Sequence, residues 1–306
     1  MIFYFSATGN CKNVAQVIAE RTGERTVAIA DELIRGERGG RGERGDEANN
    51  GRAVDGVEGH DGHAECCGSE DELFSYDLAA GERVGFVTPV YFWVLPRTTE
   101  AFVRRLHLTR EGRPLDPADA YAYIVVTYGT TPGQAPRVLG DLLRERMGLR
   151  LSAAYSVKMV DTWTPMFDLS DAEKNRRVTD VAQEEARAVA ERVAACETGD
   201  FCPRLRPPRF AARLEAFSYE PSSRTELFGV TDACVGCGFC ARKCPVQAIE
   251  MRGDGRAARP VWAKPSCAVC LGCVHRCPKH AIDYGRGCAA TRTRRHGQFK
   301  NPYVRV

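Results

Sequence analysis

Two runs of cysteines carry the clearest chemistry in this sequence. The first reads Cys-Val-Gly-Cys-Gly-Phe-Cys-Ala-Arg-Lys-Cys-Pro at 234–245, and the second reads Cys-Ala-Val-Cys-Leu-Gly-Cys-Val-His-Arg-Cys-Pro at 267–278. Both follow the spacing C-x2-C-x2-C-x3-C-P, in which short loops bring four thiolates to the corners of one small cube. The spacing therefore predicts two [4Fe–4S] clusters.

The two runs form an internal repeat, because each cysteine of the first lies 33 residues before its counterpart in the second (267−234, 270−237, 273−240 and 277−244). Such a repeat predicts a pseudo-twofold arrangement, in which the last cysteine of each run binds the cluster of the other. The predicted ligands are Cys234, Cys237, Cys240 and Cys277 for one cluster, and Cys267, Cys270, Cys273 and Cys244 for the other. Structural zinc and disulfides are alternatives, but zinc sites favour two separated pairs, and neither requires a proline after each run.

Residues 226 to about 288 resemble the bacterial two-[4Fe–4S] ferredoxins in both cysteine runs and in the proline after each. The pairs Ala248-Ile249 and Ala281-Ile282 repeat at the same offset. The resemblance implies a small α+β dicluster domain whose clusters carry one electron each.

The amino-terminal segment predicts a second cofactor site. A short apolar strand at 2–5 precedes a loop of small residues, and an amphipathic helix follows from Lys12 to Arg21. Free backbone N–H groups and the helix dipole at such a junction attract an anion. The loop residues are Ser6, Ala7, Thr8, Gly9, Asn10 and Cys11.

This loop resembles the flavodoxin phosphate loop, Ser/Thr-x-Thr-Gly-x-Ser/Thr, which holds the phosphate of FMN. Ser6, Thr8, Gly9 and Asn10 match it, whereas Cys11 replaces the last hydroxyl and removes one hydrogen bond. A helix N-terminus lowers the pKa of a thiol, so a redox-active Cys11 is an alternative to a packed loop residue.

Two later loops follow strands expected at 83–88 and 121–126. The first brings three adjacent aromatic side chains, which suit stacking on a flat ring or capping of the core. The second is rich in glycine and hydroxyl groups. Their candidate cofactor-binding residues are Pro89, Tyr91, Phe92, Trp93, Thr127, Tyr128, Gly129, Thr130 and Gly133.

The elements around these loops alternate between strand and helix. Further strands are expected at 26–30 and 152–159, and helices at about 96–108, 134–147 and 171–196. Right-handed crossovers give a doubly wound parallel five-stranded sheet of order 2-1-3-4-5, with its ligand crevice at the carboxyl ends of strands 1 and 3. Residues 1–198 therefore resemble a flavodoxin-like FMN domain of the α/β class.

Three other segments have a distinct composition. Residues 35–70 contain 10 glycines, 9 acidic residues and 5 arginines but no Leu, Ile, Met or aromatic residue, which predicts a disordered insert. Metal binding by its His60, His63, Cys66 and Cys67 is an alternative. Residues 199–225 are a proline-rich connector, and the basic tail at 289–306 either packs on the acidic domain or stays solvated.

Composition and charge limit the function classes. The 306 residues suggest two domains, and no apolar run is long enough for a membrane span. The lack of a signal peptide and the 14 cysteines favour a cytoplasmic protein. Residues 226–306 carry 14 Lys and Arg against 5 Asp and Glu, whereas residues 1–225 carry 29 against 35. Without a nucleic-acid motif, we interpret the basic part as docking on its acidic neighbour rather than on nucleic acid.

The whole chain resembles the flavodoxin–ferredoxin fusion proteins of anaerobic bacteria, the EFR-type ferredoxins, through Phe-Ser-Ala-Thr-Gly-Asn, Pro-Val-Tyr-Phe-Trp, Thr-Tyr-Gly-Thr-Thr-Pro-Gly and the cysteine runs. The resemblance implies an electron-transfer protein that passes electrons between FMN and two clusters and meets redox partner proteins. A flavin-dependent reductase of a small organic substrate and a non-catalytic redox sensor are the alternatives, so the sequence leaves open whether the chain is an enzyme.

Overall fold

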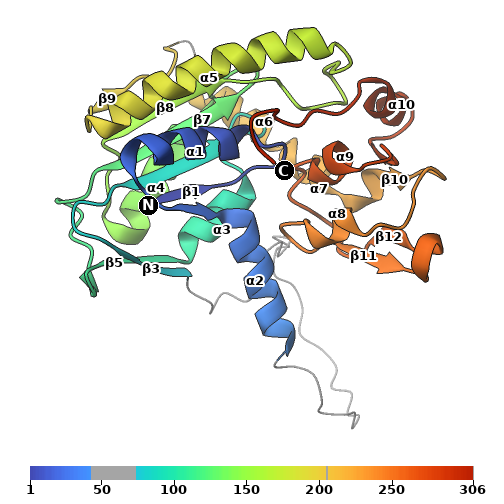
Figure 1. Ribbon diagram of the computed structural model, residues 1–306, viewed down its shortest axis with the longest axis horizontal. Helices are drawn as coiled ribbons and strands as arrows, with labels where there is room; N and C mark the ends of the chain where they lie inside the picture. The colour runs from blue at the N-terminus through green and yellow to red at the C-terminus, as the bar shows by residue number, and fades with distance from the viewer. Residues whose placement is uncertain (43–73, 205, 306) are drawn as a thin grey trace.

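The computed structural model describes residues 1–42, 74–204 and 206–305. An α/β part built on a parallel sheet lies beside a smaller part that contains the two cysteine runs (Figure 1). The four His and Cys residues at 60–67, and most of the expected insert, lie outside the described residues.

The central sheet has six strands in the order β2-β1-β4-β7-β8-β9, and every neighbouring pair is parallel. The strands are β2 (Thr26–Ala28), β1 (Ile2–Tyr4), β4 (Val84–Pro89), β7 (Ala122–Tyr128), β8 (Ala153–Lys158) and β9 (Gly199–Asp200). The first five occur in the expected order, but the expectation of only five strands is wrong. The Gly199 and Phe201 amides donate to Ser152 and Ala154, which extends the sheet into the expected connector.

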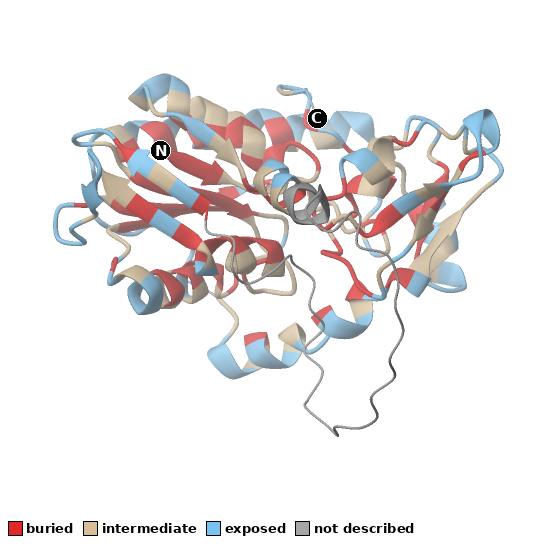
Figure 2. Ribbon diagram, turned by 90° about the horizontal axis from the view of Figure 1, so that it is seen from below, coloured by how far each residue is buried: buried red, intermediate tan, exposed pale blue. Residues whose placement is uncertain are grey.

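Helices cover both faces of this sheet, which explains its almost continuously buried strands (Figure 2). One face packs on α1 (Asn10–Thr22) and α5 (Ala172–Ala194), through a core that includes Val14 and Ala186. The other face packs on α2 (Ile29–Gly42), α3 (Arg97–Arg104) and α4 (Ala135–Met147), through residues such as Phe102 and Leu139.

Two sequence expectations fail beside this sheet. The helix expected to reach about residue 108 ends at Arg104, and β5 (Leu106–Arg110) joins β3 (Phe74–Leu78) and β6 (Arg113–Pro114) in a separate sheet. Leu106 and Leu108 are buried on either side of exposed His107, which is the two-residue period of a strand. Residues 35–42, expected in the disordered insert, belong to α2.

The cluster-binding part repeats its own architecture. It pairs β10 (Phe228–Val230) with β13 (Ile282–Tyr284) and β11 (Ile249–Arg252) with β12 (Arg259–Trp262), both antiparallel. Short helices α8 (Phe239–Arg242) and α9 (Gly272–Arg276) occupy equivalent places in the two runs. Buried Val246, Ile249, Val274 and Ile282 fill the core between them.

The expected connector and tail are ordered parts of the molecule. The connector forms α6 (Arg209–Ala216) and α7 (Tyr219–Ser223), and Tyr219 packs into the core of the cluster-binding part. The tail begins with α10 (Cys288–Arg295), whose Thr293 hydroxyl donates to the Tyr284 carbonyl at 2.8 Å.

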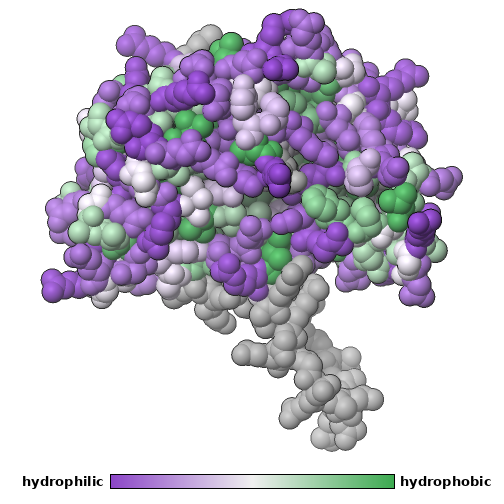
Figure 3. Space-filling model, in the orientation of Figure 1, coloured by the Kyte–Doolittle hydropathy of each residue, from purple (hydrophilic) through white to green (hydrophobic). Residues whose placement is uncertain are grey.

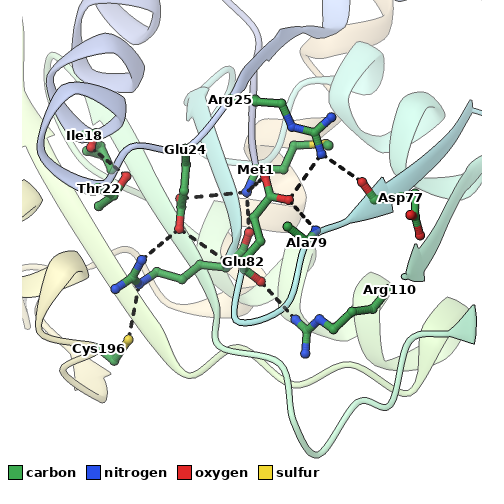
Figure 4. A network of polar contacts seen from close by, with 11 residues as sticks. Met1, Ile18, Thr22, Glu24, Arg25, Asp77, Ala79, Glu82, Arg110 and Cys196 are labelled. Atoms are coloured by element: carbon green, nitrogen blue, oxygen red, sulfur yellow. Dashed lines mark hydrogen bonds and ion pairs between the residues drawn. The ribbon is translucent and has the colours of Figure 1, made fainter. Parts of the chain in front are cut away.

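A polar network holds the amino end of β1 (Figure 4). The ammonium group of Met1 lies 3.0 Å from a Glu82 oxygen and 3.8 Å from a Glu24 oxygen. Burial lowers the pKa of this ammonium group. The Arg83 guanidinium donates to a Glu24 carboxylate oxygen at 3.0 Å and to the Cys196 sulfur at 3.2 Å. The network therefore fixes the sheet at the end away from the cluster-binding part (Figure 1).

One face of the molecule is mainly polar. The face shown in Figure 3 is largely hydrophilic, with apolar side chains in small separate groups. Within the described residues, no helix has the length and apolar character needed to cross a membrane.

Candidate functional site

A cavity of about 440 Å³ opens where the carboxyl ends of β1, β4, β7 and β8 meet. It is lined by the loops after these four strands and by one loop of the cluster-binding part. Its volume and its mixture of aromatic and polar groups are typical of a cofactor pocket. The edge position is also where a parallel α/β sheet binds its ligand.

Thirteen of the fifteen candidate cofactor residues line this cavity. They are Ser6, Ala7, Thr8, Asn10, Cys11, Pro89, Tyr91, Phe92, Trp93, Thr127, Tyr128, Gly129 and Thr130. Gly9 and Gly133 do not line it but shape its loops. Gly133 has φ +55°, and a Cβ there would lie 2.2 Å from the Trp93 carbonyl oxygen, so only glycine lets the two loops touch.

The loop before α1 has the chemistry of an anion site. Gly9, at φ 98°, precedes the helix, and its amide donates to the Ser6 hydroxyl at 3.1 Å. The backbone amides of the first turn of a helix have no intrahelical partner. In α1 no side chain caps them, so they can bind a ligand beside the loop. Those amides and the helix dipole suit a phosphate group.

Cys11 does not extend this anion site. Its sulfur lies 3.1 Å from the Thr127 hydroxyl, in the direction of β7. Burial raises the pKa of the thiol to about 12 and outweighs the hydrogen bond from Thr127. The geometry favours a packed thiol over the redox-active alternative.

The loop after β8 supplies residues that the sequence reasoning missed. Asp161, Thr162, Trp163, Met166 and Phe167 all line the cavity. The Asp161 carboxylate accepts from the Thr130 hydroxyl at 3.0 Å and from the Trp163 amide at 3.2 Å. Burial raises the pKa of this carboxyl group. The available signal was an aromatic-rich loop at the carboxyl end of the fifth strand.

The eight cysteines of the two runs surround two smaller hollows. The first is lined by Cys234, Cys237, Cys240 and Cys277, together with Val235, Met251, Pro260 and Lys279. The second is lined by Cys244, Cys267, Cys270 and Cys273, with Cys240 at its edge. The first hollow thus combines three cysteines of one run with the last cysteine of the other, as the crossed arrangement requires. The second combines Cys267, Cys270 and Cys273 with Cys244 and also with Cys240.

The chemistry of these hollows fits iron–sulfur clusters. All 12 described cysteines are free thiols, and in the described part no three His, Cys, Asp or Glu side chains are grouped to hold a single metal ion. A cubane needs sulfurs spread around a hollow, because each thiolate binds a different iron. Burial raises the pKa of Cys240 and of Cys244 to about 11.

The cavity and the second hollow share a wall. Val269, Cys270 and Leu271 line the cavity, and Cys270 also lines the second hollow. From the same loop region, Arg276 donates to the Ser6 carbonyl at 2.9 Å. His275, fully buried, accepts from the Phe299 amide through Nδ1, so its Nε2 donates to the Thr162 carbonyl at 2.9 Å.

The carboxyl-terminal tail also contacts the loop before α1. The Asn301 amide donates to the Thr8 carbonyl at 2.8 Å, and its side chain donates to the Asn10 side-chain oxygen at 3.1 Å. Asn301 is only 2% exposed. Lys12 donates to the Arg305 carbonyl at 2.7 Å. The tail therefore packs on the α/β part, which is one of the two outcomes left open by the sequence.

Comparison with known proteins identifies one part of the chain. Residues 233–282 match the model of a family described as the 4Fe-4S dicluster domain. No curated protein matches the chain. The chain thus contains a ferredoxin-type domain that supports an iron–sulfur electron-transfer role, and the match lies within the range expected from the cysteine runs.

Proposed function

We propose that this chain is an electron-transfer protein that binds FMN in the cavity and exchanges electrons between it and the two [4Fe–4S] clusters. In this proposal residues 1–198 form the FMN domain, and the clusters are bound by the crossed cysteine sets. Partner proteins deliver and remove the electrons. The many free thiols favour a reducing compartment, and we place the protein in anaerobic redox metabolism.

One observation carries the proposal: a predicted cluster ligand, Cys270, forms part of the cavity wall. The cluster domain is therefore attached at the mouth of the candidate FMN site. When bound, FMN accepts two electrons or passes them singly, and each cubane carries one, so two clusters match one fully reduced flavin.

The residues of this chain have separate roles in the proposal. Backbone amides at the start of α1 bind the phosphate, and Tyr91, Phe92 and Trp93 flank the ring. Arg276 and His275 hold the cluster domain against the cavity loops through the Ser6 and Thr162 carbonyls. These bonds fix the separation of the two sites, on which the rate of electron transfer depends.

Anaerobic purification followed by iron, sulfide and flavin analysis tests the proposal. We expect about eight irons, about eight sulfides and about one FMN per chain, because two cubanes and one terminal phosphate site are proposed. Extraction of FAD, or of no flavin after reconstitution, would contradict the FMN site. Reduction of the clusters that leaves bound FMN oxidised would contradict the electron-transfer path.

Asp161 favours one second candidate, a flavin-dependent reductase of a small organic substrate. A carboxyl group in the cavity wall with a raised pKa can hold a proton for transfer to a substrate. Screening small oxidised compounds for turnover by the reduced protein and by Asp161→Asn distinguishes this candidate, because reduction by electron transfer alone does not need the proton of Asp161.

A further inference from the structure

The two cluster hollows differ in their access to solvent. In the first, Cys237 is exposed and the neighbouring Val235 is 42% exposed. In the second, Cys244 and Cys267 are buried. Cys240 lies on both hollows, and Cys270 links the second hollow to the cavity. The first hollow thus adjoins the second, the second adjoins the cavity, and the first hollow is the outer end of this series because its cysteines are more exposed.

Basic side chains surround that outer end. The exposed Arg242 donates to the Cys237 carbonyl at 2.9 Å, and Lys279 lines the first hollow itself. The turn of the β11–β12 hairpin also packs against the loop that holds Cys237. A Cβ on Gly236 would lie 3.3 Å from the Arg256 carbonyl oxygen.

The β11–β12 hairpin keeps an unfavourable pair of charges. Arg252 and Arg259 lie directly opposite each other across the two strands, and Arg256 lies between them in the turn. Like charges at opposed positions destabilise a hairpin. Asp254 is the acidic residue of the turn, so the hairpin end retains a positive surplus.

The other described residues leave this surplus without paired carboxylates. In the described ranges, no acidic side chain forms an ion pair with Arg252, Arg256 or Lys279. Lys243 of the cluster part forms an ion pair with Asp31 of the α/β part at 3.9 Å. In Figure 3 the corner that holds β11 and β12 shows apolar side chains bordered by hydrophilic ones.

We propose that a separate acidic one-electron carrier protein docks on this basic rim, defined as Arg242, Arg252, Arg256 and Lys279, beside the exposed Val235 of the first hollow. The proposal rests on the cluster part of the proposed function. In each encounter the reduced carrier loses one electron and the cluster of the first hollow gains it, without transfer of a proton or formation of a bond. Nearby Asp232 and Glu250, together with Asp254 and the net negative charge of a cubane with four thiolates, reduce the positive field, so the rim acts through the local placement of its four cations and not through a large net charge.

The test measures binding rather than turnover. The probe is a purified acidic bacterial two-[4Fe–4S] ferredoxin, immobilised for biolayer interferometry under argon, with the anaerobic holoprotein in solution. Cytochrome c, a basic one-electron carrier, serves as the probe of opposite charge. We expect ferredoxin binding to weaken by about tenfold or more between low and physiological salt, and cytochrome c not to bind.

Two double variants with the same change of charge locate the surface. Arg252→Glu with Arg256→Glu reverses the rim and also gives Arg259 an opposite charge across the hairpin, so folding should be preserved. Arg292→Glu with Arg295→Glu makes the same change on α10, which lies at the other end of the cluster-binding part (Figure 1). We expect the rim variant to lose about tenfold or more in affinity and the α10 variant less than about twofold.

Iron, sulfide and flavin contents and the circular dichroism spectrum are measured on the same samples. Loss of FMN with intact clusters would count against the proposed flavin site and leave the binding result valid. Equal losses in the two variants would show a general charge effect and overturn the docking surface. Ferredoxin that does not bind, or cytochrome c that binds as tightly, would overturn an acidic partner.

Discussion

Gly133→Ala tests whether contact between two loops sets the shape of the cavity. Gly133 has φ +55°, and an added Cβ would lie 2.2 Å from the Trp93 carbonyl oxygen, a backbone atom. That oxygen also accepts the Gln134 amide at 2.7 Å, so it cannot move without loss of this bond. The substitution should therefore push the loop that carries Trp93 away from the loop after β7.

The expected cost has two separable parts. A left-handed conformation costs alanine about 1–2 kcal/mol relative to glycine. The clash adds about 1–3 kcal/mol, and loss of the Gln134 bond adds about 1 kcal/mol. Gly23→Ala is the matched control, because Gly23 has φ +73° and nothing within 4 Å of its added Cβ. It should show the first part alone.

Urea unfolding followed by circular dichroism, and titration of flavin-free protein with FMN by fluorescence quenching, measure the two consequences. Gly133→Ala should lose about 2–4 kcal/mol more stability than Gly23→Ala. Its FMN affinity should fall by about tenfold or more, since 1.4 kcal/mol corresponds to tenfold. If the two variants unfold alike, or if Gly133→Ala binds FMN like the original protein, the loops are not held together in this way.

Three further outcomes are expected. Cys244→Ser should damage the cluster of Cys267, Cys270 and Cys273, and Cys277→Ser should damage the cluster of Cys234, Cys237 and Cys240. Paramagnetic NMR of both variants identifies the damaged cluster. Damage to the cluster of the mutated run itself would reject crossed ligation. Asn301→Ala removes a buried hydrogen bond to Asn10 and should weaken FMN binding about fivefold. Tyr303→Phe, the control, removes an exposed hydrogen bond to Asp180 and should leave FMN binding unchanged. Equal FMN affinities of the two variants would contradict this role for the tail. Burial raises the pKa of Asp161 above its usual value of 3.8, so the original protein loses stability as pH rises from the unfolded pKa through the folded pKa. Asp161→Asn should therefore gain stability relative to the original protein across that interval and keep the gain at higher pH. A difference in urea midpoint that does not change with pH would show an unshifted group.

Local chemistry made the cluster runs and the loop before α1 predictable. Thiolates that bind one cubane require short, fixed spacings. The motif from Cys234 to Cys244 can therefore be recognised from the sequence without knowledge of the fold. The segment from Ser6 to Cys11 joins a strand directly to a helix. Its backbone amides are therefore expected at the helix N-terminus, beside the carboxyl end of that strand. The order of the first five strands followed from right-handed crossovers.

The missed features depend on contacts between distant segments. Asp161 lines the cavity because its carboxylate packs on Gly129 and Thr130, and the aromatic-rich loop at 159–170 does not by itself reveal this contact. Strand β9 has only two residues, too few for a periodic signal. Residues 106–108 lay within the helix expected at about 96–108, but pairing with β3 places them in strand β5.

The bonds between the tail and the first loop bear on the biosynthesis of the protein. Thr8 and Asn10 emerge from the ribosome long before Asn301, which contacts both. The sheet can form early, since domains fold as units and the amino-terminal one folds first. The loop before α1 gains its last partners only after both cysteine runs have been synthesised. The cavity is therefore completed only after the cluster cysteines have been synthesised. Cluster insertion can thus take place before a cofactor binds in the cavity.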